Sequence, residues 1–168
     1  IVSPLTKYAK SVTDPRDVRF ELEQAFHLAT SGRKGPVWLD IPMDVQGAMI
    51  DEASLRPYLA ETHQPAEFDA DAVVRLIQKS RRPLLVLGHG LRLSGQTARA
   101  LQLAERLSIP AVVTFGGFDL LPNDHACYAG RIGTLGTRGG NFTLQNADLI
   151  VFLGTRNNVR QISYNWEN

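Results

Sequence analysis

Three turns in the second half of the chain combine glycine with polar residues, and each directly follows an apolar segment. They lie at residues 88–90, 114–117 and 154–156. In an open parallel sheet, ligands bind outside the carboxyl ends of the strands, and glycine lets a backbone approach a ligand closely. If the apolar segments are strands of one sheet, the turns meet at one edge, where the sequence predicts a nucleotide-like ligand.

The first of these turns is the candidate for binding a phosphate. Gly88 and Gly90 precede a helix that we expect to begin at Ser94, and unpaired amides at the start of a helix bind anions. The turn does not match the dinucleotide fingerprint, because Gly95 falls too far beyond Gly90. A tight connection that needs glycine only for its shape is an equal alternative. Arg156 leaves two possibilities as well, since a guanidinium pairs with a phosphate or with a surface carboxylate.

The other residues with chemical potential form no recognisable catalytic or metal pattern. The four histidines lack the spacing of metal ligands. Cys127 is the single cysteine, and we expect it to be a small buried apolar residue. Glu21 and Glu23 fall on an expected helix, and we interpret both as solvated side chains. The sequence therefore predicts no metal site and offers no candidate catalytic residue.

The elements that must position the glycine turns alternate between strand and helix. Residues 84–87, 110–113 and 149–153 are almost wholly apolar, as expected of strands buried on both faces of a parallel sheet. Between them, apolar residues recur at helical spacing. The helices are expected to start at Asp69 or Asp71, at Ser94 and at Asn141. We therefore predict an α/β fold, an open parallel sheet with helices on both faces that is similar to a Rossmann fold.

The N-terminal part predicts a partial α/β domain. Residues 37–41 are apolar apart from Asp40, as expected of a strand buried on both faces of a parallel sheet. The helix before this strand is expected to be capped by Asp14. One strand-helix-strand unit is too small to stand alone. Residues 47–68 contain prolines and isolated charges without a period, which indicates a linker. The predicted domains are residues 1–46, a linker at 47–68 and a central domain at 69–168.

Composition excludes several classes of protein. The formal net charge is +1 without a basic run, so nothing predicts binding to nucleic acid. No apolar stretch approaches the ~20 residues of a membrane span. A single cysteine excludes an internal disulfide. We expect a cytoplasmic protein with no membrane partner.

The motifs of the N-terminal part resemble one family when they are taken in order. Segment 4–8 (PLTKY), the Asp14-Pro15 pair and segment 35–46 (GPVWLDIPMDVQ) closely resemble the end of the pyrimidine-binding domain of certain thiamine-diphosphate enzymes. These are the enzymes of the acetolactate (acetohydroxyacid) synthase type. The second half of the chain looks like the central domain of the same enzymes. The resemblance therefore covers almost the whole sequence.

The resemblance implies a set of cofactor-binding residues, because the central domain of acetohydroxyacid synthases holds FAD through turns of this kind. The implied set is Gly88, Gly90, Thr114, Gly116, Gly133, Gly136, Gly154 and Arg156. The sequence departs from the family pattern at His89, at Leu135 and at the Asn157-Asn158 pair, so the retention of FAD is left open. The resemblance also places Lys7 near the substrate channel, with a solvated lysine at a strand edge as the alternative.

The activity implied by the resemblance is thiamine-diphosphate-dependent carboligation or decarboxylation of a 2-oxo acid, in a homo-oligomeric enzyme. In this family a glutamate polarises the aminopyrimidine of the cofactor and a Gly-Asp-Gly motif holds magnesium. We expect both outside these residues, so that the segment is not catalytic alone. The alternatives are a stand-alone module that binds FAD or an adenine nucleotide, and an assembly scaffold.

Overall fold

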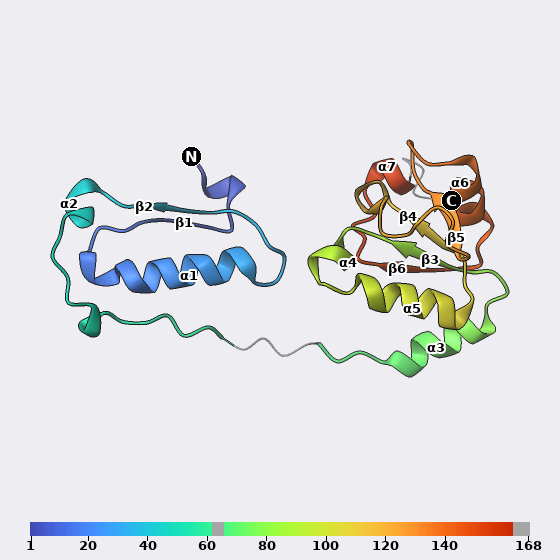
Figure 1. The fold of residues 1–168 in the computed structure, drawn as a ribbon, viewed down its shortest axis with the longest axis horizontal. Helices are drawn as coiled ribbons and strands as arrows, with labels where there is room; N and C mark the ends of the chain where they lie inside the picture. Colours follow the sequence, from blue (N-terminus) through green and yellow to red (C-terminus); the bar gives the residue numbers. More distant parts are fainter. Residues whose placement is uncertain (62–65, 163–168) are drawn as a thin grey trace. The chain divides into compact units, whose positions relative to one another are not determined.

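The chain folds as two compact units (Figure 1), residues 1–66 (unit 1) and 67–168 (unit 2). The computed structural model describes residues 1–61 and 66–162. Among the helices it describes, none combines the length and the apolar character that crossing a membrane requires. The boundary between the units lies inside the stretch that the sequence predicts as a linker.

Unit 1 contains a two-stranded parallel sheet and one long helix. Strand β1 (Tyr8–Ser11) pairs with β2 (Val37–Asp40), with Tyr8 opposite Val37. Helix α1 (Val18–Thr30) connects the two strands and lies along the sheet, and the short helix α2 (Met43–Gln46) follows β2 (Figure 1). The strand-helix-strand unit predicted from the sequence is therefore present.

Asp14 caps the turn that leads into α1, and the sequence predicts this capping role. Its carboxylate accepts a hydrogen bond from the Arg16 amide at 2.9 Å and forms an ion pair with the Arg16 guanidinium at 2.6 Å. These interactions with Arg16 lower the pKa of Asp14 to about 2. A 3-10 turn, Pro15–Asp17, then leads into the helix.

Part of the stretch that the sequence assigns to a linker packs against α1. The Tyr58 amide donates a hydrogen bond to the Glu23 carboxylate at 2.7 Å. The Tyr58 ring meets the Phe20 ring edge-on, with 5.5 Å between centroids, and the Arg56 guanidinium lies 3.9 Å from the Phe20 centroid. This segment follows the 3-10 turn Glu52–Ser54 and is therefore a packed part of unit 1.

The interpretation of Glu21 as a solvated side chain is wrong. Glu21 is only 7% exposed, and its carboxylate accepts a hydrogen bond from the Tyr8 hydroxyl. Burial of the phenol, followed by its hydrogen bond to Glu21, raises the pKa of Tyr8 to about 12. The face of α1 that carries Glu21 turns toward β1, where a tyrosine supplies the donor. Glu23 is partly exposed and pairs with Arg19 at 2.8 Å.

The expectation that residues 37–41 are buried on both faces is also wrong. Trp38 in β2 is 53% exposed, and in α1 the apolar Leu22 and Phe26 are 50% and 73% exposed. The helix covers one face of the two-stranded sheet, and the sheet covers one face of the helix. Apolar side chains on the opposite faces, such as Trp38 and Phe26, are therefore exposed.

Unit 2 is built on a four-stranded sheet in which every pairing is parallel. Its strands are β3 (Pro83–Leu87), β4 (Ala111–Val113), β5 (Tyr128–Arg131) and β6 (Leu149–Leu153), in the spatial order β5-β4-β3-β6. Leu85 lies opposite Ala111 on one side and Val151 on the other. The α/β fold with a parallel sheet is confirmed, and the three strands predicted from the sequence are neighbours.

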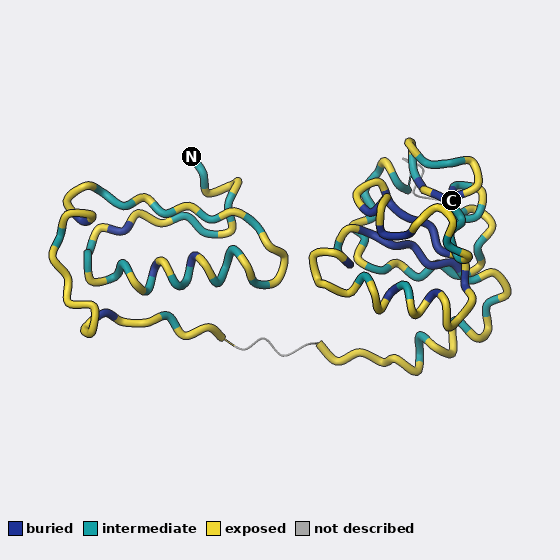
Figure 2. Tube along the Cα trace, in the orientation of Figure 1, coloured by how far each residue is buried: buried dark blue, intermediate teal, exposed yellow. Residues whose placement is uncertain are grey.

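Helices cover both faces of this sheet (Figure 1). Helices α3 (Ala70–Lys79), α4 (Gly90–Leu93) and α5 (Thr97–Leu107) lie on one face, where Leu85 and Leu87 pack against Ala100 and Ala104. Helix α6 (Arg138–Asn146) lies on the other face, where Leu144 packs against Leu84 and Val86. The short helix α7 (Val159–Ile162) follows β6. The darkest tube in Figure 2 follows the two central strands, so the core of unit 2 is centred on β3 and β4.

The expected helix start at Ser94 is wrong, because Ser94 ends α4 instead. Its amide donates to the Gly90 carbonyl at 3.0 Å and its hydroxyl to the Leu91 carbonyl at 3.1 Å. Gly95 then takes a positive φ of 68°, and α5 begins at Thr97. The expected start at Asp69 is confirmed, since its carboxylate accepts a hydrogen bond from the Ala72 amide at 2.8 Å.

Strand β5 was not predicted from the sequence. Residues 130–140 contain so many glycines that they suggest a loop, yet Tyr128 pairs with Ala111 and Arg131 with Val113.

Helix α6 begins at Arg138 rather than at Asn141, because the Thr137 hydroxyl accepts a hydrogen bond from the Gly140 amide at 3.1 Å.

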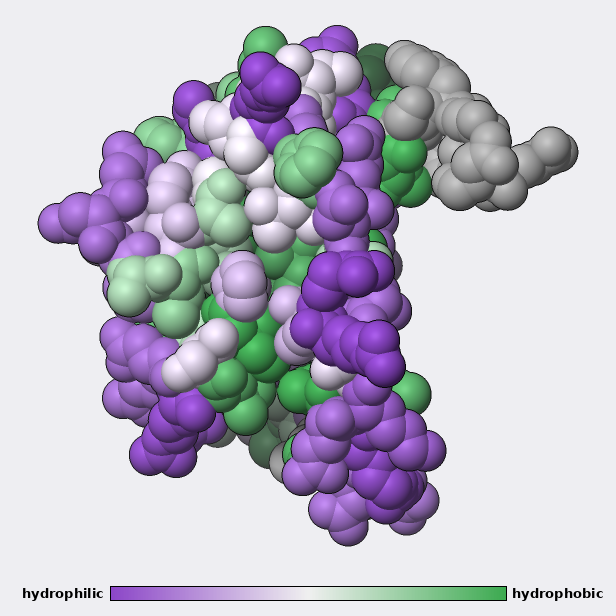
Figure 3. Space-filling model, turned by 90° about the vertical axis from the view of Figure 1, so that its right-hand side faces the viewer, coloured by the Kyte–Doolittle hydropathy of each residue, from purple (hydrophilic) through white to green (hydrophobic). Residues whose placement is uncertain are grey.

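Apolar side chains also reach the surface of unit 2. On the face that Figure 3 presents, green apolar groups occupy the centre between purple hydrophilic margins. Phe152 of the edge strand β6 is 39% exposed, whereas Val86 of the central strand β3 is fully buried. An edge strand has a covered side and an uncovered side, which accounts for this difference.

Candidate functional site

The glycine-bearing turns meet at the carboxyl edge of the sheet in unit 2. The strands that precede them, β3, β4 and β6, are adjacent and parallel. Backbone hydrogen bonds continue past the strand ends, from the Thr114 amide to the Leu87 carbonyl at 3.0 Å and from the Gly88 amide to the Leu153 carbonyl at 2.9 Å. The sequence therefore locates this edge, and the turn after β5 joins it.

Gly88, Gly90 and Gly154 touch one another through their backbones. The Gly90 amide donates a hydrogen bond to the Gly154 carbonyl at 2.9 Å. A Cβ added at Gly88 would lie 2.3 Å from that carbonyl oxygen, and one added at Gly90 would lie 2.8 Å from it. Gly154 itself has a φ of 65°, and a Cβ there would lie 2.5 Å from the Leu91 amide. All three positions need glycine for contact between two segments of the chain.

Thr114 and Gly116 occupy the turn after β4. Thr114 is 4% exposed, and its carbonyl accepts a hydrogen bond from the Gly117 amide at 3.0 Å, which closes a 3-10 turn. A Cβ at Gly116 would meet only the Cβ of His89, at 3.5 Å, which is an ordinary contact. Gly116 is therefore the most open glycine of the predicted set near this edge.

Gly133 and Gly136 shape the turn after β5. Gly133 has a φ of 96°, and a Cβ there would lie 2.7 Å from the Arg160 carbonyl oxygen. The Asn141 side chain holds Gly133 at both ends, accepting from its amide at 2.9 Å and donating to its carbonyl at 3.1 Å. The Gly136 amide donates to the Gly133 carbonyl at 2.9 Å. This turn is thus pinned to α6 and lies against the segment of α7.

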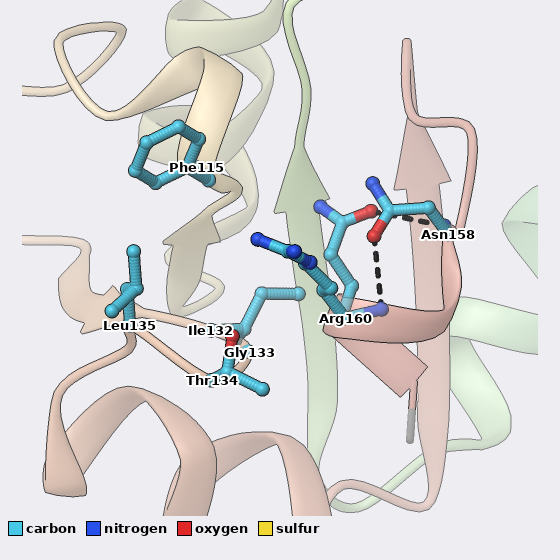
Figure 4. A pocket seen from close by; sticks show the side chains of 8 residues that line it. Phe115, Ile132, Gly133, Thr134, Leu135, Asn158 and Arg160 are labelled. Carbon is cyan, nitrogen blue, oxygen red and sulfur yellow. Dashed lines mark hydrogen bonds between the residues drawn. The ribbon is translucent and has the colours of Figure 1, made fainter. Parts of the chain in front are cut away.

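A small pocket opens between the turns that follow β4, β5 and β6 (Figure 4). In Figure 4 the Phe115 ring, the Leu135 side chain and the Arg160 guanidinium come from three different segments and border the same space. Its lining residues are Phe115, Ile132, Gly133, Thr134, Leu135, Asn158, Arg160 and Gln161. The Asn158 side chain is held by the Arg160 amide, which donates to its Oδ1 at 3.0 Å.

The chemistry of this pocket suits a compact group. One aromatic ring and two branched aliphatic side chains offer apolar contact, and Arg160 offers a cation with several donors. The pocket holds about 110 Å³, whereas pockets for drug-sized ligands hold about 300–1,000 Å³. In this conformation it accommodates a few water molecules or a small planar group, and not a dinucleotide.

Of the predicted binding residues, only Gly133 lines this pocket. Phe115 and Leu135 are direct neighbours in sequence of predicted residues, so two of the predicted turns border the pocket through side chains that were not predicted. Asn158 and Arg160 were not predicted as binding residues, because they lie beyond the glycine turn at residues 154–156. Their one sequence signal is that they follow the carboxyl end of an apolar strand. Arg156 is exposed.

Lys7 lies in unit 1, where its ammonium is engaged by the end of α1. It donates hydrogen bonds to the carbonyls of Leu28 and Ser31, the latter at 2.9 Å, and its aliphatic chain packs 3.1 Å from the position of a Cβ on Gly35. A lysine at the carboxyl end of a helix satisfies carbonyls that lack a partner. Lys7 thus has a structural role in this conformation, and its place near a substrate channel stays a prediction.

Among the described residues, no three His, Cys, Asp or Glu side chains gather where they could hold a metal ion. Both ring nitrogens of His125 have a partner within the chain. Its Nε2 lies 3.1 Å from the Glu105 carboxylate, and its Nδ1 accepts a hydrogen bond from the Cys127 amide at 3.2 Å. These contacts fix the loop before β5. Cys127 is partly buried against the core on the α5 face.

Comparison with protein families identifies unit 2. Residues 70–168 match the family model of the central domain of thiamine pyrophosphate enzymes. The chain therefore belongs to the thiamine pyrophosphate enzymes, and the resemblance to that class noted in the sequence is confirmed.

Individual relatives narrow the similarity to enzymes of the acetolactate synthase type. The chain is 36% identical over 162 residues to the acetolactate synthase isozyme 1 large subunit of Escherichia coli K12, covering 95% of this chain and 28% of that protein. It is 35% identical to the glyoxylate carboligase of Escherichia coli O157:H7, covering 93% of this chain and 27% of the relative. It is also 33% identical to a probable acetolactate synthase large subunit of Methanocaldococcus jannaschii, covering 91% and 27%. The chain thus spans less than a third of each of these relatives.

The glycine turn after β3 does not fit the diphosphate of FAD. A phosphate cradle needs amides without partners. Here the Gly88 and Gly90 amides are already bonded to the carbonyls of Leu153 and Gly154. The space that the missing side chains leave is filled by the chain itself.

Proposed function

We propose that this chain is part of an acetolactate synthase-like enzyme that uses thiamine diphosphate and magnesium to act on a 2-oxo acid, by carboligation or decarboxylation. The main support is that the similarity to acetolactate synthases extends over 162 residues, and therefore through both units. A stand-alone nucleotide-binding module would require similarity to unit 2 alone, so that alternative and the assembly scaffold are less favoured.

Within such an enzyme, this chain supplies scaffold rather than reacting groups. Thiamine diphosphate, when bound, supplies the ring that stabilises a carbanion during carbon–carbon bond making and breaking. We propose that the glutamate and the magnesium motif that anchor it lie outside these residues. The described residues instead provide a rigid parallel sheet in unit 2 and the β1-α1-β2 unit, with Lys7 proposed near the substrate channel.

The proposal includes a homo-oligomer and a location in the cytoplasm. The exposed Trp38 and Phe26 of unit 1 are the kind of surface that a larger domain or a partner subunit would cover. Some relatives are named as chloroplastic, so a plastid is the alternative location.

The experiment is an assay of the full-length protein with pyruvate, thiamine diphosphate and Mg²⁺, followed by detection of carbon dioxide and acetolactate. We expect turnover that depends on thiamine diphosphate, with glyoxylate as a second substrate to separate the two kinds of relative. The matched control omits the cofactor. Absence of turnover of both acids, together with no binding of thiamine diphosphate in calorimetry, would refute the proposal.

The segment by itself is proposed to be inactive. We expect the 168-residue polypeptide, once circular dichroism shows that it is folded, to bind no thiamine diphosphate in the presence of Mg²⁺. Binding at micromolar concentration would place an anchor inside these residues.

A further inference from the structure

The strand order of unit 2 defines where a ligand would normally bind. From β3 the chain crosses to β4 and then β5 on one side, and it returns to place β6 on the other side of β3. In open α/β sheets the crevice forms at such a reversal, outside the carboxyl ends of the two strands that flank it. In this chain the reversal lies between β3 and β6.

Backbone atoms fill the position of that crevice. The turn after β3 donates two hydrogen bonds to the end of β6 and the turn beyond it, from Gly88 to Leu153 and from Gly90 to Gly154, both at 2.9 Å. A Cβ at any of the three glycines would lie between 2.3 and 2.8 Å from the opposite segment. Real Cβ atoms do not approach that closely, so the two turns are as near to each other as backbones can be.

The local helix geometry also disfavours a phosphate at this turn. Helix α4 has only four residues and ends at Ser94, so it has little dipole. The longer helix α5 begins at Thr97, beyond Gly95, and its N-terminus does not directly follow the strand end. Phosphate binding of this kind needs a strand, a glycine turn and a long helix in direct succession. Here the short helix α4 and Gly95 interrupt that succession.

We infer that Gly88, Gly90 and Gly154 form a backbone crossing that closes the reversal point between β3 and β6, and that no dinucleotide diphosphate binds there. These positions require glycine because two chain segments cross there. The pocket bordered by Phe115, Leu135 and Arg160 stays open to a ligand at this edge. This inference concerns the packing of the chain and does not depend on the proposed reaction.

The first test compares glycine variants of the full-length protein by thermal unfolding. Gly88→Ala and Gly154→Ala should lower the Tm of the transition that contains unit 2 by more than about 5 °C, or prevent folding, because the added methyl meets backbone. Gly116→Ala is the matched control, since its Cβ meets only a side-chain atom at 3.5 Å, and its Tm should stay unchanged. An unchanged Tm in Gly88→Ala and Gly154→Ala would overturn the inference.

The second test uses the unaltered protein, so it does not depend on a variant that folds. Hydrogen exchange followed by mass spectrometry should show slow exchange in peptides that contain Gly88 and Gly90, and addition of FAD or ADP should leave that exchange unchanged. Binding of FAD with unchanged protection at this turn, or no binding, supports a closed crossing. Fast exchange that slows when FAD is added would show an open phosphate site and would overturn the inference.

Discussion

The Gly90 amide donates a hydrogen bond to the Gly154 carbonyl at 2.9 Å, although the two residues lie in turns after different strands. Through this bond the turn that opens α4 is held against the turn that leaves β6. Five residue pairs align β3 with β6, from Pro83 opposite Leu149 to Leu87 opposite Leu153, and the glycine contact continues that register beyond the strands. At the ends of β3 and β6 the carboxyl edge of the sheet is therefore packed backbone against backbone. The small pocket lies between the turns that follow β4, β5 and β6.

The core of unit 2 centres on β3, and Leu85→Ala tests this. Leu85 is fully buried, so its truncation should lower the free energy of unfolding by about 2–5 kcal/mol. Urea unfolding of the full-length protein, followed by a probe in unit 2, measures the change. Leu103→Ala in α5 is the control, because Leu103 is 38% exposed and should lose much less. Equal losses at the two positions would contradict this description of the core.

Asp148, directly before β6, is hydrogen-bonded to the segment that leads into β3. Its carboxylate accepts hydrogen bonds from the Ser80 hydroxyl and from the Arg81 and Arg82 amides at 2.9 and 2.8 Å, and these bonds lower its pKa from 3.8 to about 2. The stabilisation by Asp148 is therefore complete above pH 3.8 and is lost as the pH falls through about 2.

The variant Asp148→Asn should show that dependence directly. Its Tm should be below that of the unaltered protein at neutral pH, and the difference should shrink as the pH falls toward 2. Asp124→Asn, in the exposed loop before β5, is the control and should change Tm little. A difference that is independent of pH would exclude the carboxylate as the cause.

The buried Glu21 accepts a hydrogen bond from the half-buried Tyr8 in unit 1, and Tyr8→Phe removes this donor. The Glu21 carboxylate would then be buried without this partner, which should cost about 1–3 kcal/mol. Because the pKa of Tyr8 is raised from 10.0 to about 12, its contribution is present below pH 10 and is lost as the pH rises through about 12.

Chemical unfolding of unit 1 measures that cost. Tyr58→Phe keeps the ring contact with Phe20 and serves as the control for loss of a hydroxyl. If both variants lose the same stability, the Tyr8–Glu21 hydrogen bond contributes nothing specific.

Lys7→Met tests the structural role of Lys7 at the end of α1 and its predicted place near the substrate channel. Loss of the ammonium leaves the Leu28 and Ser31 carbonyls without their cation, and a cation at a helix C-terminus contributes about 0.3–1 kcal/mol. We expect a lower Tm for unit 1. If Lys7 also lies near the substrate channel, the KM for the 2-oxo acid should rise, whereas an unchanged KM would leave Lys7 as a helix cap alone. Lys10→Met, in the strand β1 that follows Lys7, is the control.

Asn141 fixes the turn that forms one wall of the pocket. Asn141→Ala removes its two hydrogen bonds to Gly133 and leaves the Gly133 amide unpaired, whereas the Gly133 carbonyl keeps its bond from the Gly136 amide. The unpaired amide should lower the free energy of unfolding by about 1–3 kcal/mol. Gln145→Ala, an exposed position on the same helix, is the control. Urea unfolding measures both, and a neutral Asn141→Ala would show that the turn is held by its neighbours.

Parts of the fold follow from local patterns in the sequence. The apolar runs of β3, β4 and β6 and the capping residues Asp14 and Asp69 are properties of a few consecutive residues, so they could be predicted without knowledge of contacts. Strand β5 could not, because Gly130 interrupts its pattern and its pairing with β4 comes from a segment elsewhere in the chain.

The candidate site was predictable as a place and not as a set of side chains. The sequence by itself determined that glycine turns follow strands of a parallel sheet and that the chain resembles thiamine-diphosphate enzymes. Only the tertiary structure decided what those glycines do, because a glycine looks the same in sequence whether a phosphate or another backbone approaches it. It decided also that Glu21 is buried, since only the fold brings the Tyr8 hydroxyl to that face of the helix.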